Sequence, residues 1–298
     1  MSDAPTPPGL VIVDKPAGWT SHDVVGRMRR LARTRKVGHS GTLDPMATGV
    51  LVLGVQRATR LLGHLTLADK EYLASIRLGQ TTITDDAEGD VTASVAADHL
   101  DLPAVRAAML PLTGDIEQVP SSVSAIKVDG VRSYARVRSG DEVTLAARPV
   151  SVPVFEASEL NVATTDTGEQ VVDVAVRVVC SSGTYVRALA RDLGAALGVG
   201  GHLTMLRRTR VGGYGLDRAH TLDELAEDLT VLDLDTAARD GFASVDLTPE
   251  QAADVRFGRA LPDLRLTVAP TALFDPDGHF LALYEPKGSG ARPVAVFV

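Results

Sequence analysis

"GHSGTLDPMATGVLVLGVQRATR", residues 38–60, places one carboxylate, Asp44, between a glycine-rich turn and an apolar run. Gly38 and Gly41 permit backbone conformations that a side chain would exclude. Pro45 disfavours helical geometry at Asp44, and the run "GVLVLGV" that follows is typical of a short buried strand. The stretch therefore predicts a tight extended turn that carries Asp44 and leads into the core of a sheet.

An isolated aspartate on a turn has more than one use. Asp44 could simply cap the next element of secondary structure. A phosphate-binding loop is disfavoured, because "GHSGTLDP" lacks the Gly-Lys-Ser/Thr ending that places a lysine on phosphates. A serine hydrolase centred on Ser40 is also disfavoured, since no strand is followed by a Gly-x-Ser-x-Gly elbow. From these residues alone, a capping role and a catalytic role both remain open.

Strand and helix signals alternate along the rest of the chain without a strict repeat. Apolar or alternating runs predict strands at 10–16, 72–79 and 171–180. Capping residues and helical periodicity predict five helices. The first begins at Thr20 or Ser21 and runs to about Leu31, the second follows Asp101, and the third covers 184–197. The fourth follows the capping pair Thr221 and Glu224, and the fifth begins at Pro249. This mixture predicts an α+β fold with a largely antiparallel sheet.

The length of 298 residues, of which 45% are hydrophobic, favours one large domain followed by a smaller one. The acidic stretch 220–240 is a candidate border. Beyond it, "LFDPDGHFLALYE" predicts a hairpin that turns at Asp277-Gly278. The sequence thus predicts a large domain over 1–243 and a small, mostly β domain over 244–298.

The net charge of −8 hides an uneven distribution of charged residues. Residues 1–60 carry nine Lys/Arg against four Asp/Glu, whereas 220–254 carry ten acids against the single Arg239. The basic residues gather in "GRMRRLARTRK" (26–36), and a second basic group stands at 207–210. Either segment could be an ordinary solvated surface; if the two converge in space, they would form an electrostatic footprint for phosphates.

Several classes of protein are disfavoured by composition. No apolar run reaches the length of a membrane span, and the first residues lack the pattern of a secretion signal. Cys180 is the single cysteine, so no internal disulfide can form, and no Cys/His group has zinc-ligand spacing. We expect a cytoplasmic protein that needs no metal.

Five segments, in order, resemble the motifs of the TruB family of tRNA pseudouridine-55 synthases, over most of the first 220 residues. They are "LVIVDKPAGWTSHDVV" (10–25), the opening stretch at 38–60, "KEYLASIRLGQTTITDDAEG" (70–89), "VPSSVSAIKVDGVRSYARVRSG" (119–140) and "CSSGTYVRALARDLG" (180–194). The resemblance implies a pseudouridine synthase fold and an isomerase that converts uridine 55 in the T loop of tRNA into pseudouridine. It also implies a small C-terminal PUA-like RNA-binding domain.

The resemblance assigns catalytic roles to three residues. Asp44 is implied to be the catalytic aspartate, Tyr72 to lie against the target base, and Arg187 to lie beside Asp44. The chemistry suits them, because a carboxylate can attack C1′ of the sugar or C6 of the base and form a covalent intermediate. A neighbouring arginine would orient the carboxylate. Two ordinary readings compete: Tyr72 as a sheet-facing aromatic, and Arg187 as a partner of Asp192.

The remaining implied residues would bind the RNA. His39 resembles the loop histidine that enters the T arm when bases are flipped out of the stack, and Asp86 the acid that meets the polar edge of the flipped pyrimidine. The pocket walls would be Tyr185 and Leu206. The residues expected near backbone phosphates are Lys15, Arg30, Arg33, Arg207 and Arg208.

The implied partner is the T-arm stem-loop of tRNA, bound by a monomer with no obligatory protein partner. Two alternatives remain: a non-catalytic RNA-binding or tRNA-folding chaperone on the same fold, and a related synthase acting on another RNA. The guide-RNA-dependent branch is disfavoured because the chain has no long lysine-rich extension. The C-terminal basic residues are dispersed, so the sequence shows no basic cluster for RNA contact in that domain.

Overall fold

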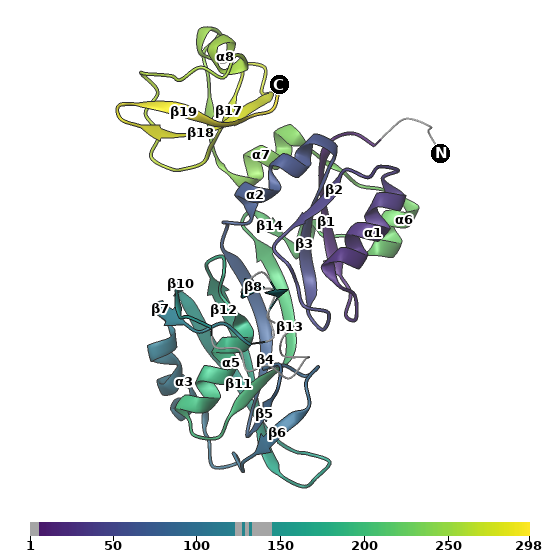
Figure 1. The fold of residues 1–298 in the computed structure, drawn as a ribbon, viewed down its shortest axis with the longest axis vertical. Coiled ribbons are helices and arrows are strands. Elements are labelled where there is room, and N and C mark those ends of the chain that lie inside the picture. The colour runs from purple at the N-terminus through teal and green to yellow at the C-terminus, as the bar shows by residue number, and fades with distance from the viewer. Residues whose placement is uncertain (1–5, 123–126, 129–130, 133–144) are drawn as a thin grey trace. The chain divides into compact units, whose positions relative to one another are not determined.

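A computed structural model describes residues 6–122, 127–128, 131–132 and 145–298 (Figure 1). Most of the predicted motif at 119–140 lies outside the described residues. The chain divides into two compact units. The first comprises residues 1–45, 49–68 and 210–298, and the second comprises 46–48 and 69–209.

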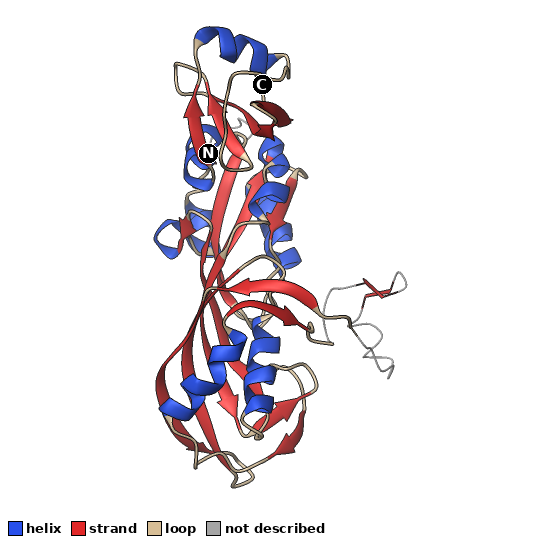
Figure 2. Ribbon diagram, turned by 90° about the vertical axis from the view of Figure 1, so that its left-hand side faces the viewer, coloured by secondary structure: helices blue, strands red, loops and turns tan. Residues whose placement is uncertain are grey.

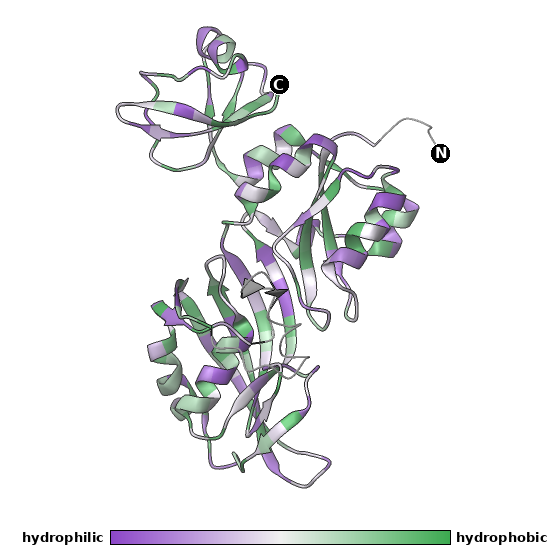
Figure 3. Ribbon diagram, in the orientation of Figure 1, coloured by the Kyte–Doolittle hydropathy of each residue, from purple (hydrophilic) through white to green (hydrophobic). Residues whose placement is uncertain are grey.

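The first unit is built on strand β1 (Gly9–Lys15), which pairs antiparallel along its whole length with β3 (Thr48–Val55). β2 (Val37–Ser40) pairs with β3, and β15 (Leu232–Asp233) adds two residues to the other edge of β1. Both long strands are apolar over most of their length (Figure 3). Strands with this composition are typically covered on both faces.

Side chains of β1 alternate between two hydrophobic clusters, as the period of two in a strand requires. Leu10 and Ile12 join the cluster that contains Leu61 and Tyr214, whereas Val11 and Val13 join the cluster of α1 (Ser21–Leu31). The predicted start of α1 is confirmed: Thr20 caps the helix and forms a capping box with Asp23. The sheet is thus buried on both sides.

Short helices complete the unit around this sheet. They are η1 (Gln56–Arg60), α2 (Leu62–Leu65), η3 (Leu216–Arg218), α6 (Leu222–Glu227) and α7 (Leu234–Gly241), with strand β14 (Tyr214–Gly215). The capping box predicted at Thr221 and Glu224 opens α6.

The C-terminal residues form a four-stranded sheet in the order β16-β17-β18-β19. Its elements are β16 (Ala243–Asp246), α8 (Pro249–Arg256), β17 (Thr271–Phe274), β18 (Phe280–Lys287) and β19 (Gly290–Val296). The predicted hairpin is present, and Gly278 has the positive φ, 86°, of its turn. Phe274, Phe280 and Phe297 share the hydrophobic cluster of Leu10, which explains why these residues belong to the first unit.

The second unit contains a sheet with the strand order β11-β12-β4-β13. Strands are drawn red in Figure 2. These strands are β11 (Val154–Thr164), β12 (Gln170–Cys180), β4 (Lys70–Leu78) and β13 (Gly201–Val211). Helices α3 (Leu102–Met109) and α5 (Val186–Ala196) pack against each other and against strands of this sheet. As predicted, Asp101 caps α3.

Smaller elements flank this sheet in the second unit. They are β5 (Gln80–Thr82) paired with β6 (Val91–Ser94), β7 (Gly114–Gln118) paired with β10 (Arg148–Val152), β8 (Lys127–Val128) paired with β9 (Val131–Arg132), and η2 (Leu110–Leu112). The predicted α+β class and the small C-terminal β module are confirmed. The division into domains at residue 243 stays a prediction.

Candidate functional site

Asp44 lies in the loop between β2 and β3, as the opening stretch predicts. These strands form an antiparallel hairpin from Val37 opposite Val55 to Ser40 opposite Val52. Gly41 begins the loop with φ of +70°, a conformation that favours glycine. Leu43 and Ala47 are buried, whereas Asp44 is half-buried. The loop is thus anchored in the core on both sides of a carboxylate that is not itself buried.

The residue before Asp44 is held by the hydroxyl of Ser21. Ser21 Oγ donates to the carbonyl of Leu43 at 3.1 Å and accepts from the amide of Leu43 at 2.9 Å. Ser21 is fully buried in the first turn of α1. One side chain therefore fixes both backbone groups of the residue next to Asp44, and it ties the loop to the helix.

The residue after Asp44 is held by Lys15, at the end of β1. The Lys15 ammonium donates to the carbonyls of Pro16 at 2.9 Å, Trp19 at 2.6 Å and Pro45 at 3.1 Å. The amide of Gly18 donates to the same Pro45 carbonyl at 2.8 Å. Segment 15–21 thus grips the chain on both sides of Asp44.

The expectation that Lys15 contacts phosphates is therefore corrected. Its side chain is fully buried, at 0% exposure, and it is bonded to backbone carbonyls. A buried ammonium is stable only when its donors are satisfied, and three loop carbonyls provide this. No local pattern indicated this burial, because Pro45 is 30 residues away along the chain.

A second buried group of charges lies in the second unit. Asp86 is 2% exposed and Arg187 6% exposed, with Arg187 Nη1 at 3.5 Å from Asp86 Oδ2. The same Nη1 donates to the carbonyl of Thr84 at 2.9 Å. Asp86 Oδ1 accepts from the Thr84 hydroxyl and, at 3.0 Å, from the amide of Glu88. The carboxylate of Asp86 is thus bound by its own loop and by helix α5.

The alternative interpretation of Arg187 was an ion pair with Asp192. In the structure Arg187 pairs with Asp86, and the arginine at Asp192 is Arg191. Arg191 pairs with Asp192 at 2.8 Å and with Asp85 at 3.5 Å. Burial raises the pKa of Asp85, and the nearby Arg191 and Arg187 oppose that rise. Asp85 has φ of +59°, and the two adjacent aspartates meet different arginines: Asp85 meets Arg191 and Asp86 meets Arg187.

Tyr72 lies on the buried face of β4, 7% exposed and opposite Val178 of β12. Lys70, two residues earlier, is on the same face, and burial together with Arg208 lowers its pKa to about 8. Burial also raises the pKa of Cys180, opposite Lys70, to about 11. Tyr72 is therefore both a sheet residue and a neighbour of titratable groups.

The other predicted pocket residues of the second unit differ in their surroundings. Tyr185 precedes α5, and its backbone amide and carbonyl exchange hydrogen bonds with the side chain of Gln118, at 2.8 and 3.1 Å. Leu206 is 6% exposed on β13. Arg207 Nη1 donates to Thr48 Oγ1 at 3.3 Å. Arg208 is 1% exposed, so almost none of its side chain is open to the phosphates predicted for it.

His39 and the first basic segment belong to the first unit. His39 lies on β2, where its ring meets the ring of His22 edge-on, with centroids 5.5 Å apart. Arg30 and Arg33 are exposed at the end of α1 and just after it. Asp44 belongs to this unit and Tyr72 and Arg187 to the other, so the convergence of the three stays a prediction.

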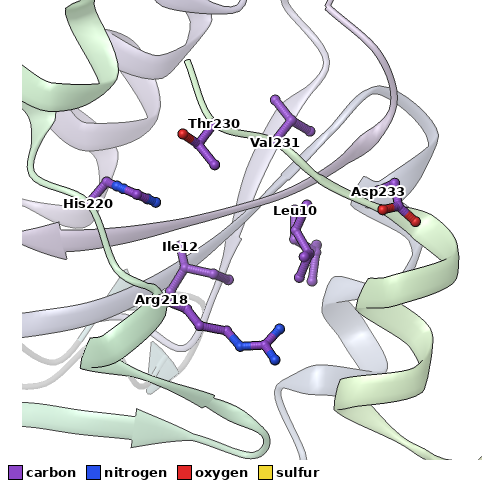
Figure 4. A pocket seen from close by; sticks show the side chains of 8 residues that line it. Leu10, Ile12, Arg218, His220, Thr230, Val231 and Asp233 are labelled. Carbon is purple, nitrogen blue, oxygen red and sulfur yellow. The ribbon is translucent and has the colours of Figure 1, made fainter. Parts of the chain in front are cut away.

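The first unit also contains a pocket that no sequence pattern indicated (Figure 4). Its volume is about 290 Å³, and it opens at the edge of β1. It is lined by Leu10, Ile12, Arg218, His220 and residues 230–233. None of the predicted site residues lines it, so we assign it no part in the site.

The described part of the chain has neither a metal-binding group nor a membrane-spanning helix. There, no group of three or more His, Cys, Asp or Glu residues could hold a metal ion. None of the helices described is long and apolar enough to cross a membrane.

Comparison with known families decides what kind of protein contains this site. The model of the TruB family pseudouridylate synthase N-terminal domain matches residues 29–186. The chain belongs to the TruB family. Two further models match the residues that follow: the tRNA pseudouridylate synthase B C-terminal domain at 187–241 and the tRNA pseudouridine synthase II C-terminal model at 242–298. The predicted resemblance is thus confirmed over nearly the whole chain.

Individual TruB relatives match the chain from end to end. A tRNA pseudouridine synthase B of Paenarthrobacter aurescens is 59% identical, over 97% of this chain and 94% of the relative. One of Streptomyces griseus is 58% identical, over 98% of both chains. Among solved structures, a Cbf5-Nop10-Gar1 complex contains a similar chain with a TM-score of 0.72 and 27% identity, covering 97% of this chain and 85% of that one.

Proposed function

We propose that this chain is a tRNA pseudouridine synthase that isomerises uridine 55 in the T loop of tRNA. The observation that carries the proposal is identity of 57–59% over nearly full length to proteins named tRNA pseudouridine synthase B. The same relatives favour tRNA over the guide-dependent RNAs of the second alternative. Nothing in the comparisons favours a chaperone without activity.

In the proposed reaction, Asp44 is the nucleophile. The N1–C1′ bond of uridine breaks, the base rotates, and a C5–C1′ bond forms. The proton lost from C5 is balanced by the proton gained at N1, so no redox cofactor is required. Attack by the carboxylate at C1′ or at C6 would form the covalent intermediate that divides the reaction into two easier steps. The anchored loop supports this role, because it fixes the backbone at Leu43 and Pro45.

Two residues of the second unit complete the proposed catalytic group. Arg187 would orient the Asp44 carboxylate, and its rigid attachment to Asp86 and Thr84 suits a positioning cation. Tyr72 would stack on the base and accept the proton that leaves C5. That Asp44, Arg187 and Tyr72 lie together in one site is part of this proposal.

The uridine must leave the stack of the folded T loop before it can react. We assign His39 to entry into the loop, Asp86 to the polar edge of the base, and Tyr185 and Leu206 to the pocket walls. Extrusion costs a few kcal/mol, about the stacking and pairing energy of one base. Arg30, Arg33 and Arg207 would contact backbone phosphates and repay part of that cost.

The remaining expectations belong to the same proposal. The enzyme would act in the cytoplasm as a monomer, without a metal, cofactor or obligatory protein partner. The C-terminal sheet would be the PUA-like domain of 244–298. Three of its arginines pair with acids: Arg256 with Asp275, Arg259 with Asp254 and Arg292 with Glu285. Strong phosphate binding by this domain is therefore not expected.

The decisive experiment maps the product. Purified protein is incubated with an unmodified tRNA transcript, and pseudouridine is located at single-nucleotide resolution. We expect modification at position 55 alone. Modification at another position, or none with a folded protein that binds the transcript, would contradict the proposal.

A further inference from the structure

A shallow pocket of about 400 Å³ opens along the first turns of α1. It is lined by Gly18, Trp19, His22, Asp23, Gly26 and Arg30. All six residues belong to the first unit, and the roles assigned above use only Arg30. The pocket combines an aromatic ring, a guanidinium group and positions without side chains.

Trp19 gives the pocket a rigid aromatic wall. The indole is half-buried and packs against the cluster that contains Val24 and Met28. Its carbonyl accepts a hydrogen bond of 2.6 Å from the buried Lys15 ammonium. The indole packs against the core and also lines the pocket, so it is suited to stacking on a base. Little side-chain conformational entropy is lost when a base binds to a ring that is already fixed.

Gly26 keeps the floor of the pocket open. It lies in the interior of α1, where glycine destabilises a helix relative to alanine. A Cβ at this position would meet nothing within 4 Å. Packing therefore does not explain the glycine, whereas the space that it leaves in the pocket does.

The charges at the pocket suit a nucleotide. Residues 21–36 contain six Lys/Arg and one acid, Asp23. Asp23 Oδ2 accepts from the amide and hydroxyl of Thr20, at 3.0 and 2.6 Å, in the helix cap. The guanidinium of Arg30 can meet a phosphate, and Asp23 Oδ1 can accept a hydrogen bond from a base.

The pocket also adjoins the proposed loop-entering histidine. His22, which lines the pocket, contacts the ring of His39 edge-on. We propose that this pocket binds one unpaired nucleotide of the T arm, other than the reacting uridine, with its base on Trp19 and its phosphate at Arg30. This inference rests on the proposed function, because it assumes that His39 meets the T loop.

The pocket can be tested by fluorescence, since Trp19 is the single tryptophan of the chain. The full-length protein is titrated with an unmodified T-arm stem-loop. Tryptophan fluorescence is recorded with excitation at a wavelength at which tyrosine absorbs little. We expect saturable quenching with the same midpoint as binding measured by filter retention. Binding without any change in emission would overturn the proposal.

Gly26 provides the variants that separate binding from folding. Gly26→Met fills the pocket, and Gly26→Ala fills it partly while improving helix propensity. Gly63 in α2 gives a matched control, because a Cβ there also meets nothing within 4 Å. We expect Gly26→Met to weaken stem-loop binding about tenfold, Gly26→Ala to weaken it less at equal or higher thermal stability, and Gly63→Met to leave it unchanged.

The outcomes distinguish this inference from the proposed function. Wild-type binding by both folded Gly26 variants would overturn the pocket even if pseudouridine forms at position 55. Quenching that is lost in Gly26→Met would support the pocket as an RNA site even if the wild type forms no pseudouridine. Quenching by whole tRNA but not by the stem-loop would overturn the assignment to the T arm.

Discussion

Two aspartates of this protein are held in opposite ways. Around Asp44 the neighbouring backbone is fixed, by Ser21 at Leu43 and by Lys15 at Pro45, and the carboxylate remains half-buried. At Asp86 the carboxylate itself is fixed, by Thr84, Glu88 and Arg187, and is 2% exposed. The contacts beside Asp44 keep its loop in place for the proposed reaction, and the contacts to the Asp86 oxygens hold that carboxylate where the proposed base would meet it.

The sharpest test of this contrast is Asp44→Asn. It removes the proposed nucleophile but keeps the shape of a half-buried side chain. We expect pseudouridine formation to fall by more than about 100-fold, while the free energy of unfolding changes by less than about 0.5 kcal/mol. Tritium release from C5-labelled uridine measures the first and urea denaturation the second. A variant that keeps more than about a tenth of the rate, a barrier change below about 1.4 kcal/mol, would exclude Asp44 as the nucleophile.

Asp86→Ala, unlike Asp44→Asn, should clearly lower the free energy of unfolding. It leaves Arg187 as a buried cation without its carboxylate, and breaking such a pair costs about 3–5 kcal/mol. The exposed Asp90, four residues later in the same segment, gives the control variant Asp90→Ala, which should cost less than about 0.5 kcal/mol. Urea denaturation measures both. Equal stability of the two variants would show that the Asp86–Arg187 pair contributes little to folding.

Lys15→Met tests whether the hydrogen bonds of Lys15, which hold the backbone of the Asp44 loop, also stabilise the first unit. The change leaves the carbonyls of Pro16, Trp19 and Pro45 without the ammonium. We expect a loss of about 2 kcal/mol, smaller than for Asp86→Ala, because a buried polar group left without its partner costs about 1–3 kcal/mol. Lys36→Met, at an exposed lysine of the same unit, is the control. If both variants unfold at the same temperature, the hydrogen bonds of Lys15 do not stabilise the unit.

Local features of this fold could be predicted from the sequence, and distant contacts could not. Thr20, Asp101 and Thr221 cap helices at the predicted positions because a cap depends on residues three or four places away. The burial of Lys15 depends on Pro45, 30 residues away, and that of Arg187 on Thr84, 103 residues away. The resemblance placed Lys15 near backbone phosphates, and only the packed chain shows that its side chain is buried.

In the candidate site, too, local features could be predicted from the sequence and distant contacts could not. Asp44 could be located because glycine, proline and an apolar run mark its turn within a few residues. Ser21 was considered only as a helix cap, since nothing in its neighbourhood indicates that its hydroxyl reaches Leu43, 22 residues away. The pocket on α1 was missed for a related reason: Gly26 looks like a weak helix residue until the space around it is known.

Ser21→Ala makes the finest test, because it removes one hydroxyl and two hydrogen bonds to Leu43. We expect a stability loss of about 1 kcal/mol. Thr59→Ala, which removes a hydroxyl bonded to the Gln56 carbonyl in the same unit, should cost a similar amount. The two variants should differ in catalysis: a looser Leu43 misplaces Asp44, so Ser21→Ala should lower kcat several-fold with KM for tRNA unchanged, whereas Thr59→Ala should change neither. If both variants lose stability and neither loses kcat, Ser21 supports the fold alone, and the position of Asp44 is set from the Pro45 side of the loop.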